Sequence, residues 1–202
     1  VLTAWGSEGC GHGEFGLQMR SVDSLGRAGG IAFDSSGNVL VTDPYNNRVQ
    51  KLNCLWSFLQ QWGYAGFGDG EFSRPEGIAV HSSGNIFVAD TWNHRVQKFD
   101  HLGNFLRKWG AEGSGEGDLY YPCGIAVDSS GYVLVADTWS YKIVKFDSLG
   151  NFVRQWGARG DGEGEFEYPY GIAVDSSRNV FVTDSENYRV QAFDSSGDFV
   201  RE

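Results

Sequence analysis

The sequence has little positive charge and no long apolar run. Its 202 residues hold 16 Lys and Arg against 26 Asp and Glu, which gives a formal net charge of −10. Proteins that grip nucleic acid draw affinity from Lys and Arg that displace phosphate counterions, so this balance argues against such a partner. No stretch approaches the roughly 18 apolar residues that a membrane-spanning helix needs. We therefore expect neither nucleic-acid binding nor a membrane span.

Targeting signals are also missing. The sequence begins without Met, a basic n-region or an apolar signal core. This is typical of a mature or trimmed product, or of a protein whose targeting signal lies in a part not included in this sequence. The compartment is therefore weakly constrained, and an extracellular location is slightly favoured over the cytoplasm.

Cysteine and histidine are scarce and scattered. Cys10, Cys54 and Cys123 occupy unrelated positions without a Cys-x-x-Cys pair, which favours incidental thiols over a disulfide or metal framework. The four histidines form no His-x-x-x-His pair, so a zinc site is not expected. The sequence also lacks a Gly-x-Ser-x-Gly elbow and a strand-to-helix phosphate loop. We therefore assign no catalytic residue and no metal site.

What the sequence does contain is a repeat. The phrase Gly-Ile-Ala-Val-Asp-Ser-Ser-Gly-Asn-Val recurs in near-copies that begin 47 residues apart, at Gly30, Gly77, Gly124 and Gly171. A fixed period of this size, with short apolar runs separated by Gly, Asn, Asp and Ser, indicates a repeat array whose single unit cannot bury its own faces.

Four short strands are expected in each unit. In the first unit they are the Gly-Ile-Ala run and residues 38–43, 48–52 and 58–62, and each has a copy in the later units. Short polar turns make neighbouring strands antiparallel, because Asn, Asp and Gly supply the backbone conformations that tight turns need. Four-stranded sheets stacked around an axis form a β-propeller, so we predict an all-β fold of four-stranded antiparallel blades.

The full motif is Gly-Glu-Phe-x-x-Pro-x-Gly-Ile-Ala-Val-Asp-Ser-Ser-Gly-Asn-Val, followed by Asp-x-x-Asn-x-Arg-Val-Gln-x-Phe-Asp. It resembles the NHL repeat family of β-propellers over nearly the whole chain. The resemblance implies a protein-interaction platform, typically one part of a larger polypeptide, in a ring that commonly closes with six blades. We assign a single domain, 1–202, with blades at about 30–63, 77–110, 124–157 and 171–202.

Two features depart from this pattern. The link before the first blade, 7–29, is elaborated: Glu14 to Gly30 spans 16 residues where Glu71 to Gly77 spans 6, and the extra residues at 16–29 are a loop elaboration or a recombination scar. Residues 1–6 resemble a fifth copy of the fourth strand. A closed ring of four blades has no place for it, so we expect an open arc or a part of a longer array.

Candidate binding residues gather on one face. In a propeller the links and the second-to-third-strand hairpins lie on a common face, and the link tyrosines Tyr120, Tyr121, Tyr168 and Tyr170 are expected there too. The repeated Asp-x-x-Asn-x-Arg is expected to cap the hairpin, with Arg paired to Asp. Rings at a variable turn position are typical of partner binding or of packing over the turn. The candidate binding residues on this face are Tyr45, Asn47, Trp92, His94, Trp139, Tyr141 and Tyr188.

Three functions remain open. A binding or assembly module would take a protein, peptide or glycan partner, or self-associate through open blade faces. A hydrolase or lyase would need an axial metal; amidating lyases, whose propeller is similar, need His, Tyr and Arg at the axis, and these cannot be placed here. A structural role would stack arcs into rings or fibres. No cofactor is assigned, although acidic link residues or axial carbonyls could hold Ca²⁺.

Overall fold

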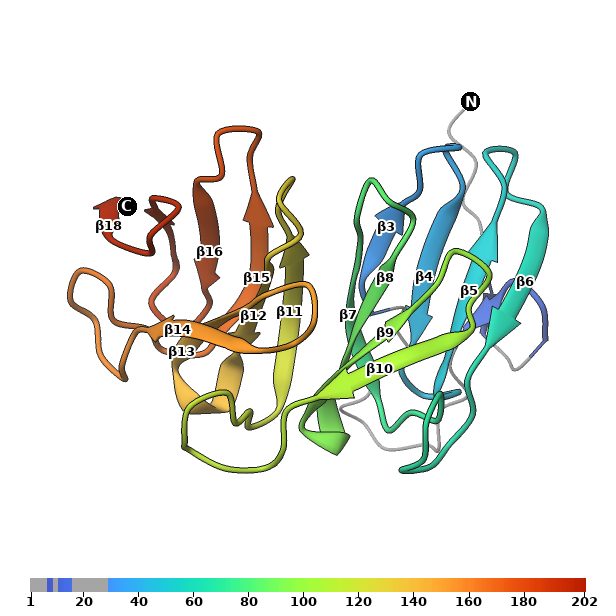
Figure 1. Cartoon of the computed structure of the whole chain (residues 1–202), viewed down its shortest axis with the longest axis horizontal. Coiled ribbons are helices and arrows are strands. Elements are labelled where there is room, and N and C mark those ends of the chain that lie inside the picture. Colours follow the sequence, from blue (N-terminus) through green and yellow to red (C-terminus); the bar gives the residue numbers. More distant parts are fainter. Residues whose placement is uncertain (1–6, 9–10, 16–28) are drawn as a thin grey trace.

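Four four-stranded antiparallel sheets make up the fold (Figure 1). The computed structural model describes residues 7–8, 11–15 and 29–202. Helical structure in these residues is limited to two 3-10 turns, η1 (Thr91–Asn93) and η2 (Thr138–Ser140). Each sheet keeps its strands in chain order, so each is one blade. The predicted all-β architecture of four-stranded blades is confirmed.

The strands follow the predicted repeat closely. Blade 1 holds β3 (Ile31–Phe33), β4 (Val39–Asp43), β5 (Arg48–Leu52) and β6 (Phe58–Trp62). Blade 2 holds β7 (Pro75–Val80), β8 (Ile86–Asp90), β9 (Arg95–Phe99) and β10 (Phe105–Trp109). Blade 3 holds β11 (Pro122–Val127), β12 (Val133–Asp137), β13 (Lys142–Phe146) and β14 (Phe152–Trp156). Blade 4 holds β15 (Pro169–Val174), β16 (Val180–Asp184), β17 (Arg189–Phe193) and β18 (Phe199–Arg201). A parallel pair, β1 (Ser7–Glu8) and β2 (Glu14–Phe15), lies before blade 1.

The glycine that opens each repeat phrase lets neighbouring first strands approach closely. A Cβ on Gly77 would overlap the carbonyl oxygen of Cys123 in the next blade, and a Cβ on Gly124 would overlap that of Tyr170. The first strands β7, β11 and β15 therefore lie side by side at the centre (Figure 1). At Gly171, on the last blade, the nearest atom to such a Cβ is the Thr183 Oγ1 of the same blade, at 3.0 Å.

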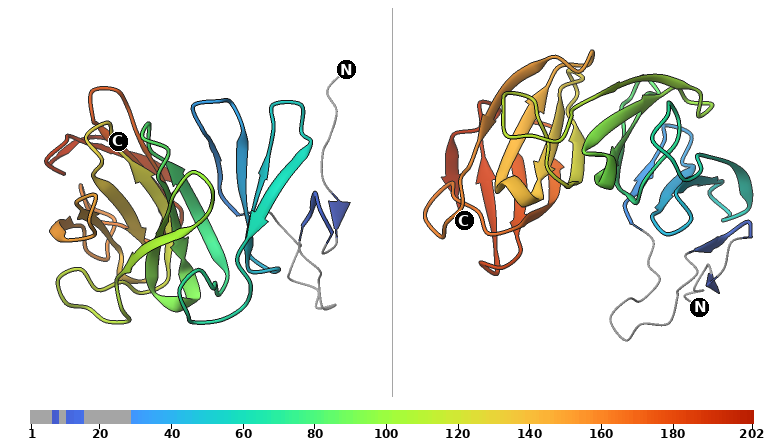
Figure 2. Two further views of the ribbon diagram at one scale, coloured as in Figure 1. Left: turned by 45° about the vertical axis from the view of Figure 1, so that its right-hand side comes forward. Right: turned by 90° about the horizontal axis from the view of Figure 1, so that it is seen from below.

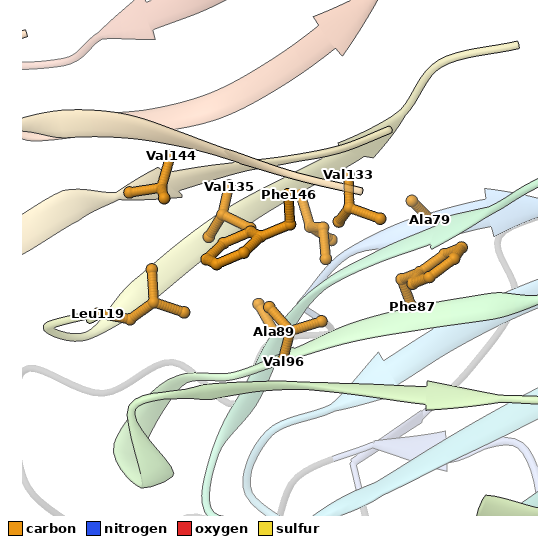
Figure 3. Packing of buried hydrophobic residues seen from close by; sticks show 10 residues of the cluster. Ala79, Phe87, Ala89, Val96, Leu119, Val133, Val135, Val144 and Phe146 are labelled. Atoms are coloured by element: carbon orange, nitrogen blue, oxygen red, sulfur yellow. The ribbon is translucent and has the colours of Figure 1, made fainter. Parts of the chain in front are cut away.

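The core lies between the blades. One cluster joins Ala79, Phe87, Ala89 and Val96 of blade 2 to buried residues of the next blade, which include Val133, Val135 and Phe146 (Figure 3). These strands carry apolar residues on both faces because each sheet is covered on both sides. A single blade would leave one such face in water, so the units stabilise one another.

The four blades follow one another along an arc that does not close (Figure 2). The link at 11–15 lies on blade 1 as later links lie on their own blades: Gly13 N–H donates to Gln50 Oε1 at 2.9 Å, as Gly70 N–H does to Gln97 Oε1. The strand expected at 1–6 and most of the elaborated segment, 16–28, lie outside the described residues.

Candidate functional site

A buried Asp at the end of the second strand anchors the hairpin that joins the second and third strands of each blade. These hairpins, one of which contains η1, lie on the predicted face, at the lower edge of Figure 1. In blade 2, Asp90 Oδ2 accepts hydrogen bonds from Asn93 Nδ2 at 2.8 Å and from Arg95 Nε at 2.7 Å. Its Oδ1 accepts the Ser73 N–H at 2.7 Å. Burial raises the pKa of Asp90, while these donors lower it. The Asp-x-x-Asn-x-Arg pattern is thus a hairpin anchor, with Arg paired to Asp as expected.

The same Arg fastens the link to its blade. Arg95 Nη1 donates to Phe67 O at 2.7 Å, and Nη2 donates to Gly68 O and Glu71 O, both at 2.8 Å. In blade 1 Arg48 donates to carbonyls of its link, and in blade 4 Arg189 does likewise. One guanidinium therefore joins a hairpin, a carboxylate and a link, which is a geometry that a point-charge ammonium cannot reproduce.

Aromatic and guanidinium groups of neighbouring blades form a continuous row on this face. The Arg74 guanidinium carbon lies 4.6 Å from the Tyr45 ring centre and 4.9 Å from that of Trp92. Centroid distances along the row are then 6.4 Å from Trp92 to Tyr121, 5.8 Å to Trp139, 5.5 Å to Tyr168 and 5.4 Å to Tyr141. We call this row the aromatic belt; it consists of Tyr45, Arg74, Trp92, Tyr121, Trp139, Tyr168 and Tyr141.

The belt alternates hairpin residues with the residue before each link proline. Arg74, Tyr121 and Tyr168 each precede a proline and lie next to rings from the hairpins, with φ of 49°, 52° and 57°. A left-handed backbone is costly for a bulky residue, by about 1 to 3 kcal/mol. Trp92 and Trp139 stay 52% and 51% exposed. The belt therefore holds strained backbone and large half-exposed rings, a combination that folding alone does not favour.

The sequence-predicted binding residues lie at or beside the belt, with one exception. Tyr45, Trp92, Trp139 and Tyr141 belong to it. Asn47 Oδ1 accepts the Arg74 N–H at 2.9 Å, and His94 Nδ1 faces the Tyr121 N–H at 3.2 Å. Tyr188 is 89% exposed on blade 4 and makes none of the ring contacts found among the described residues.

Sequence reasoning left Arg74, Tyr121 and Tyr168 out of the candidate set. The signal that could have found them is positional, because all three precede the proline that starts the first strand. Their neighbour Tyr170, which was expected on the same face, lies at the start of β15 and lines the cavity between the first strands. It stands after Pro169, where the extended strand turns its side chain away toward the propeller axis.

The axial position varies in chemistry from blade to blade. Gly29, Glu76, Cys123 and Tyr170 occupy it in turn and line a cavity of about 300 Å³ between the first strands. Tyr170 Oη donates to Glu76 Oε2 at 3.0 Å, which links blades 2 and 4 across blade 3. Cys123 is 7% exposed, and its Sγ lies 3.5 Å from Tyr121 O. The axis therefore holds a carboxylate, a thiol and a phenol.

Blade 3 departs from the hairpin anchor at three positions. Ser140, Lys142 and Val144 stand where blade 2 has Asn93, Arg95 and Gln97. Lys142 Nζ lies 3.7 Å from Asp137 Oδ2, beyond hydrogen-bond distance, and donates instead to Gln155 Oε1 at 3.1 Å.

The Asp137 carboxylate in blade 3 has fewer hydrogen-bond donors than its counterpart Asp90 in blade 2. Asp137 Oδ2 has no hydrogen-bond partner in the part of the chain that the structure describes, whereas Oδ1 accepts the Tyr120 N–H at 2.6 Å. Asp137 is completely buried. Burial raises its pKa to about 6, although Tyr120, Ser140 and Lys142 act to lower it. A buried carboxyl with a perturbed pKa beside a pocket is a candidate functional group.

Three of the acidic link residues that were considered for Ca²⁺ accept hydrogen bonds from the backbone of their own loops. Glu71 Oε2 accepts the Gly68 N–H at 2.8 Å, Asp118 Oδ2 accepts that of Gly115 at 2.9 Å, and Glu165 Oε2 accepts that of Gly162 at 3.0 Å. Within the described residues, three or more His, Cys, Asp or Glu side chains do not come together in a group that could hold a metal ion.

Comparison with protein families matches the NHL repeat at residues 25–52, 72–99 and 166–193. These segments lie in the first, second and fourth units; the third unit, where the anchor departs, is not among them. No curated protein sequence matches the chain. Within the described residues, no helix has the length and apolar character needed to span a membrane.

Three solved structures illustrate the fold. The chain is similar to virginiamycin B lyase from Staphylococcus aureus, with a TM-score of 0.66 and 16% identity over 86% of this chain and 54% of that one. The chain is also similar to hydrazine synthase from Kuenenia stuttgartiensis, with a TM-score of 0.66 and 16% identity over 86% of this chain and 48% of that one. Its similarity to a chain of the nidogen/laminin complex has a TM-score of 0.66 and 21% identity over 84% of this chain and 61% of that one. The chain thus spans about half the length of these structures, and the likeness establishes the fold alone.

Proposed function

Because the chain carries NHL repeats that fold as the blades of a β-propeller arc, we propose that it is a non-catalytic binding module whose protein or peptide partner docks on the aromatic belt. The observation that carries this proposal is the belt itself. Large rings that pack side by side while two tryptophans stay about half exposed provide rigid contact area at low entropic cost.

The chemistry of the belt favours a polypeptide. Aromatic and Arg side chains are the groups most enriched at the energetic centres of protein interfaces. The surrounding links are acidic and the chain carries a net charge of −10, which would steer a basic segment toward this face. One structural neighbour was solved in a complex of two proteins, nidogen and laminin, which is consistent with a platform of this kind.

Removing the rings of the three hairpins should abolish binding without unfolding the protein. We expect the triple variant Tyr45→Ala/Trp92→Ala/Trp139→Ala to lose at least 100-fold in affinity, because each buried anchor at an interface contributes about 2 kcal/mol or more. The ligands would be peptides selected on the wild type from a random phage-displayed library, and affinity would be measured by calorimetry. The melting temperature should change by only a few degrees, since all three rings lie at the surface.

The matched control is Trp56→Ala, which removes an exposed ring from the β5–β6 turn, away from the belt. It should leave peptide affinity unchanged. If the triple variant keeps its affinity, or melts before it can be assayed, the rings serve packing over the turns and the binding proposal fails.

A second function, head-to-tail association of the arc, is favoured by the two ends. In blade 3, Ile143 is buried against blade 4, but its counterpart Val190 in blade 4 is 51% exposed. At the other end Ile31 and Phe33 are 55% and 62% exposed, whereas Ile78 in blade 2 is 5% exposed. The exposed faces of blade 4 and blade 1 correspond to the two faces that neighbouring blades bury against each other within the arc. We propose that a second copy of this chain places its blade 1 on blade 4.

Association should therefore depend on concentration and on the face of blade 4. Sedimentation velocity of the wild type should show growth from monomer to larger species as concentration rises. Val190→Asp should remain monomeric, because it places a charge in the new joint while costing little in an exposed strand. A wild type that stays monomeric at every concentration would contradict this proposal and leave the belt unaffected.

A further inference from the structure

A pocket lies in blade 3 beside the place where the other blades hold a guanidinium group. The pocket measures about 520 Å³ and is lined by Glu112, Gly113, Ser114, Tyr120, Trp139, Ser140, Lys142 and Gln155. In blade 2 the equivalents of Gly113 and Ser114 are Gly66 and Phe67. Their carbonyl oxygens accept hydrogen bonds from Asn93 and Arg95. Blade 2 has a counterpart of this pocket, about 640 Å³, lined among others by Asn93 and Arg95. The pocket of blade 3 therefore differs not in being open but in the donors that its carboxylate lacks.

The acceptors of the guanidinium site persist in blade 3, while its guanidinium is replaced by the Lys142 ammonium, 3.7 Å from Asp137 Oδ2. In blades 1, 2 and 4 an Asp carboxylate oxygen accepts a hydrogen bond from Arg Nε, at 3.0, 2.7 and 2.9 Å. Asp137 is the equivalent carboxylate in blade 3. Its Oδ2 is buried and lacks a hydrogen-bond partner in the described part of the chain. The shorter Ser140 and the apolar Val144 replace an amide donor each. An unsatisfied buried carboxylate oxygen is costly, and a donor from outside can satisfy it.

The walls of the pocket suit a planar cation. Trp139 and Tyr120 line the pocket, and guanidinium groups stack well on aromatic rings. Glu112 adds a second negative charge to that of Asp137. Among the residues that line the pocket, the cation is Lys142, which donates a hydrogen bond to Gln155. Its flexible side chain can move further out of the pocket.

We propose that this pocket binds an arginine side chain presented by the partner, which takes the place that Arg48, Arg95 and Arg189 fill in the other blades. The proposal rests on the proposed function, because the pocket shares Trp139 with the aromatic belt and a partner on the belt would supply the arginine. It adds the chemistry of recognition: a planar, bidentate donor rather than a positive charge alone.

The test uses the intact protein and two small probes, N-acetyl-arginine amide and N-acetyl-lysine amide, titrated by calorimetry or by Trp fluorescence. The wild type should bind the arginine probe at least about tenfold more tightly than the lysine probe. Lys142→Arg should abolish saturable arginine binding, because the chain's own guanidinium then pairs with Asp137, as Arg95 pairs with Asp90. Lys142→Ala, which enlarges the pocket and removes the repelling charge, should strengthen it.

Lys145→Arg is the matched control, since Lys145 lies on the same strand but donates to Ser195 O outside the pocket. It should bind the arginine probe as the wild type does. Equal affinity of the wild type and Lys142→Arg for the arginine probe, or no saturable binding to the wild type, would overturn the proposal. The belt proposal is judged separately, because Lys142→Arg leaves Tyr45, Trp92 and Trp139 in place.

Discussion

Replacing Gly124 by Ala should destabilise the protein by about 3 kcal/mol or more. The added methyl would overlap the carbonyl oxygen of Tyr170, which belongs to the backbone of the next blade and cannot rotate away. Forcing an extra carbon into a packed contact costs about 1 to 3 kcal/mol where side chains can adjust, and more where only the main chain could move. Gly77→Ala should behave alike, because its methyl would meet Cys123 O.

The same change at Gly171 provides the internal comparison. Its methyl would meet side-chain atoms of Thr183, with Oγ1 nearest at 3.0 Å, and a small shift of that side chain relieves the contact while weakening the hydrogen bond that it accepts from Gly171 N–H. Urea unfolding of the three variants at a concentration where the protein is monomeric should show a large loss for Gly77→Ala and Gly124→Ala and a small one for Gly171→Ala. Equal losses at all three positions would show that the glycine serves its own strand rather than the joint between blades.

Truncating Arg95 should cost about 3 to 5 kcal/mol, the range for a buried ion pair that loses one partner. Asp90 is completely buried and would keep only the Asn93, Gln97 and Ser73 donors. The link would also lose the hydrogen bonds from Arg95 to Phe67 O, Gly68 O and Glu71 O. The free energy of unfolding of Arg95→Ala, taken from chemical denaturation, measures this loss.

Lys142→Ala is the counterpart in blade 3 and should cost clearly less than Arg95→Ala. Lys142 donates to Gln155 alone and lies 3.7 Å from its carboxylate, so less is lost with it. The raised pKa of Asp137, about 6, also lets that group take up a proton instead of remaining an uncompensated charge. If the two variants are equally destabilised, the guanidinium contacts with the link contribute nothing beyond charge pairing.

Most of the fold follows from the periodicity of the sequence. The second, third and fourth strands occur within one residue of the predicted ranges in the first three blades, because their turn residues and apolar runs recur at fixed offsets. The first strands begin at Pro75, Pro122 and Pro169, two residues before the glycine that we took as their start. Proline is tolerated there because the start of a strand needs no ladder hydrogen bond from its nitrogen.

The candidate site was predicted less completely. The hairpin rings Tyr45, Trp92 and Trp139 were found because they stand at a variable position in a constant turn. Tyr121 was expected on this face but was left out of the candidate set, and Arg74 was not considered. Their shared position before the link proline is visible in the sequence, but their contact with the hairpin rings is not.

The sequence by itself determined the blade, because each unit encodes its own strands, turns and apolar faces through local spacing. Only the tertiary structure decided how blades meet: which glycine faces a neighbouring carbonyl, which rings from separate repeats line up in one belt, and which buried carboxylate oxygen is left without a hydrogen-bond partner among the described residues. The contacts along the belt join residues far apart in the sequence, as Arg74 with Trp92 and Trp92 with Tyr121. Their distances depend on how the sheets pack, which no local pattern specifies.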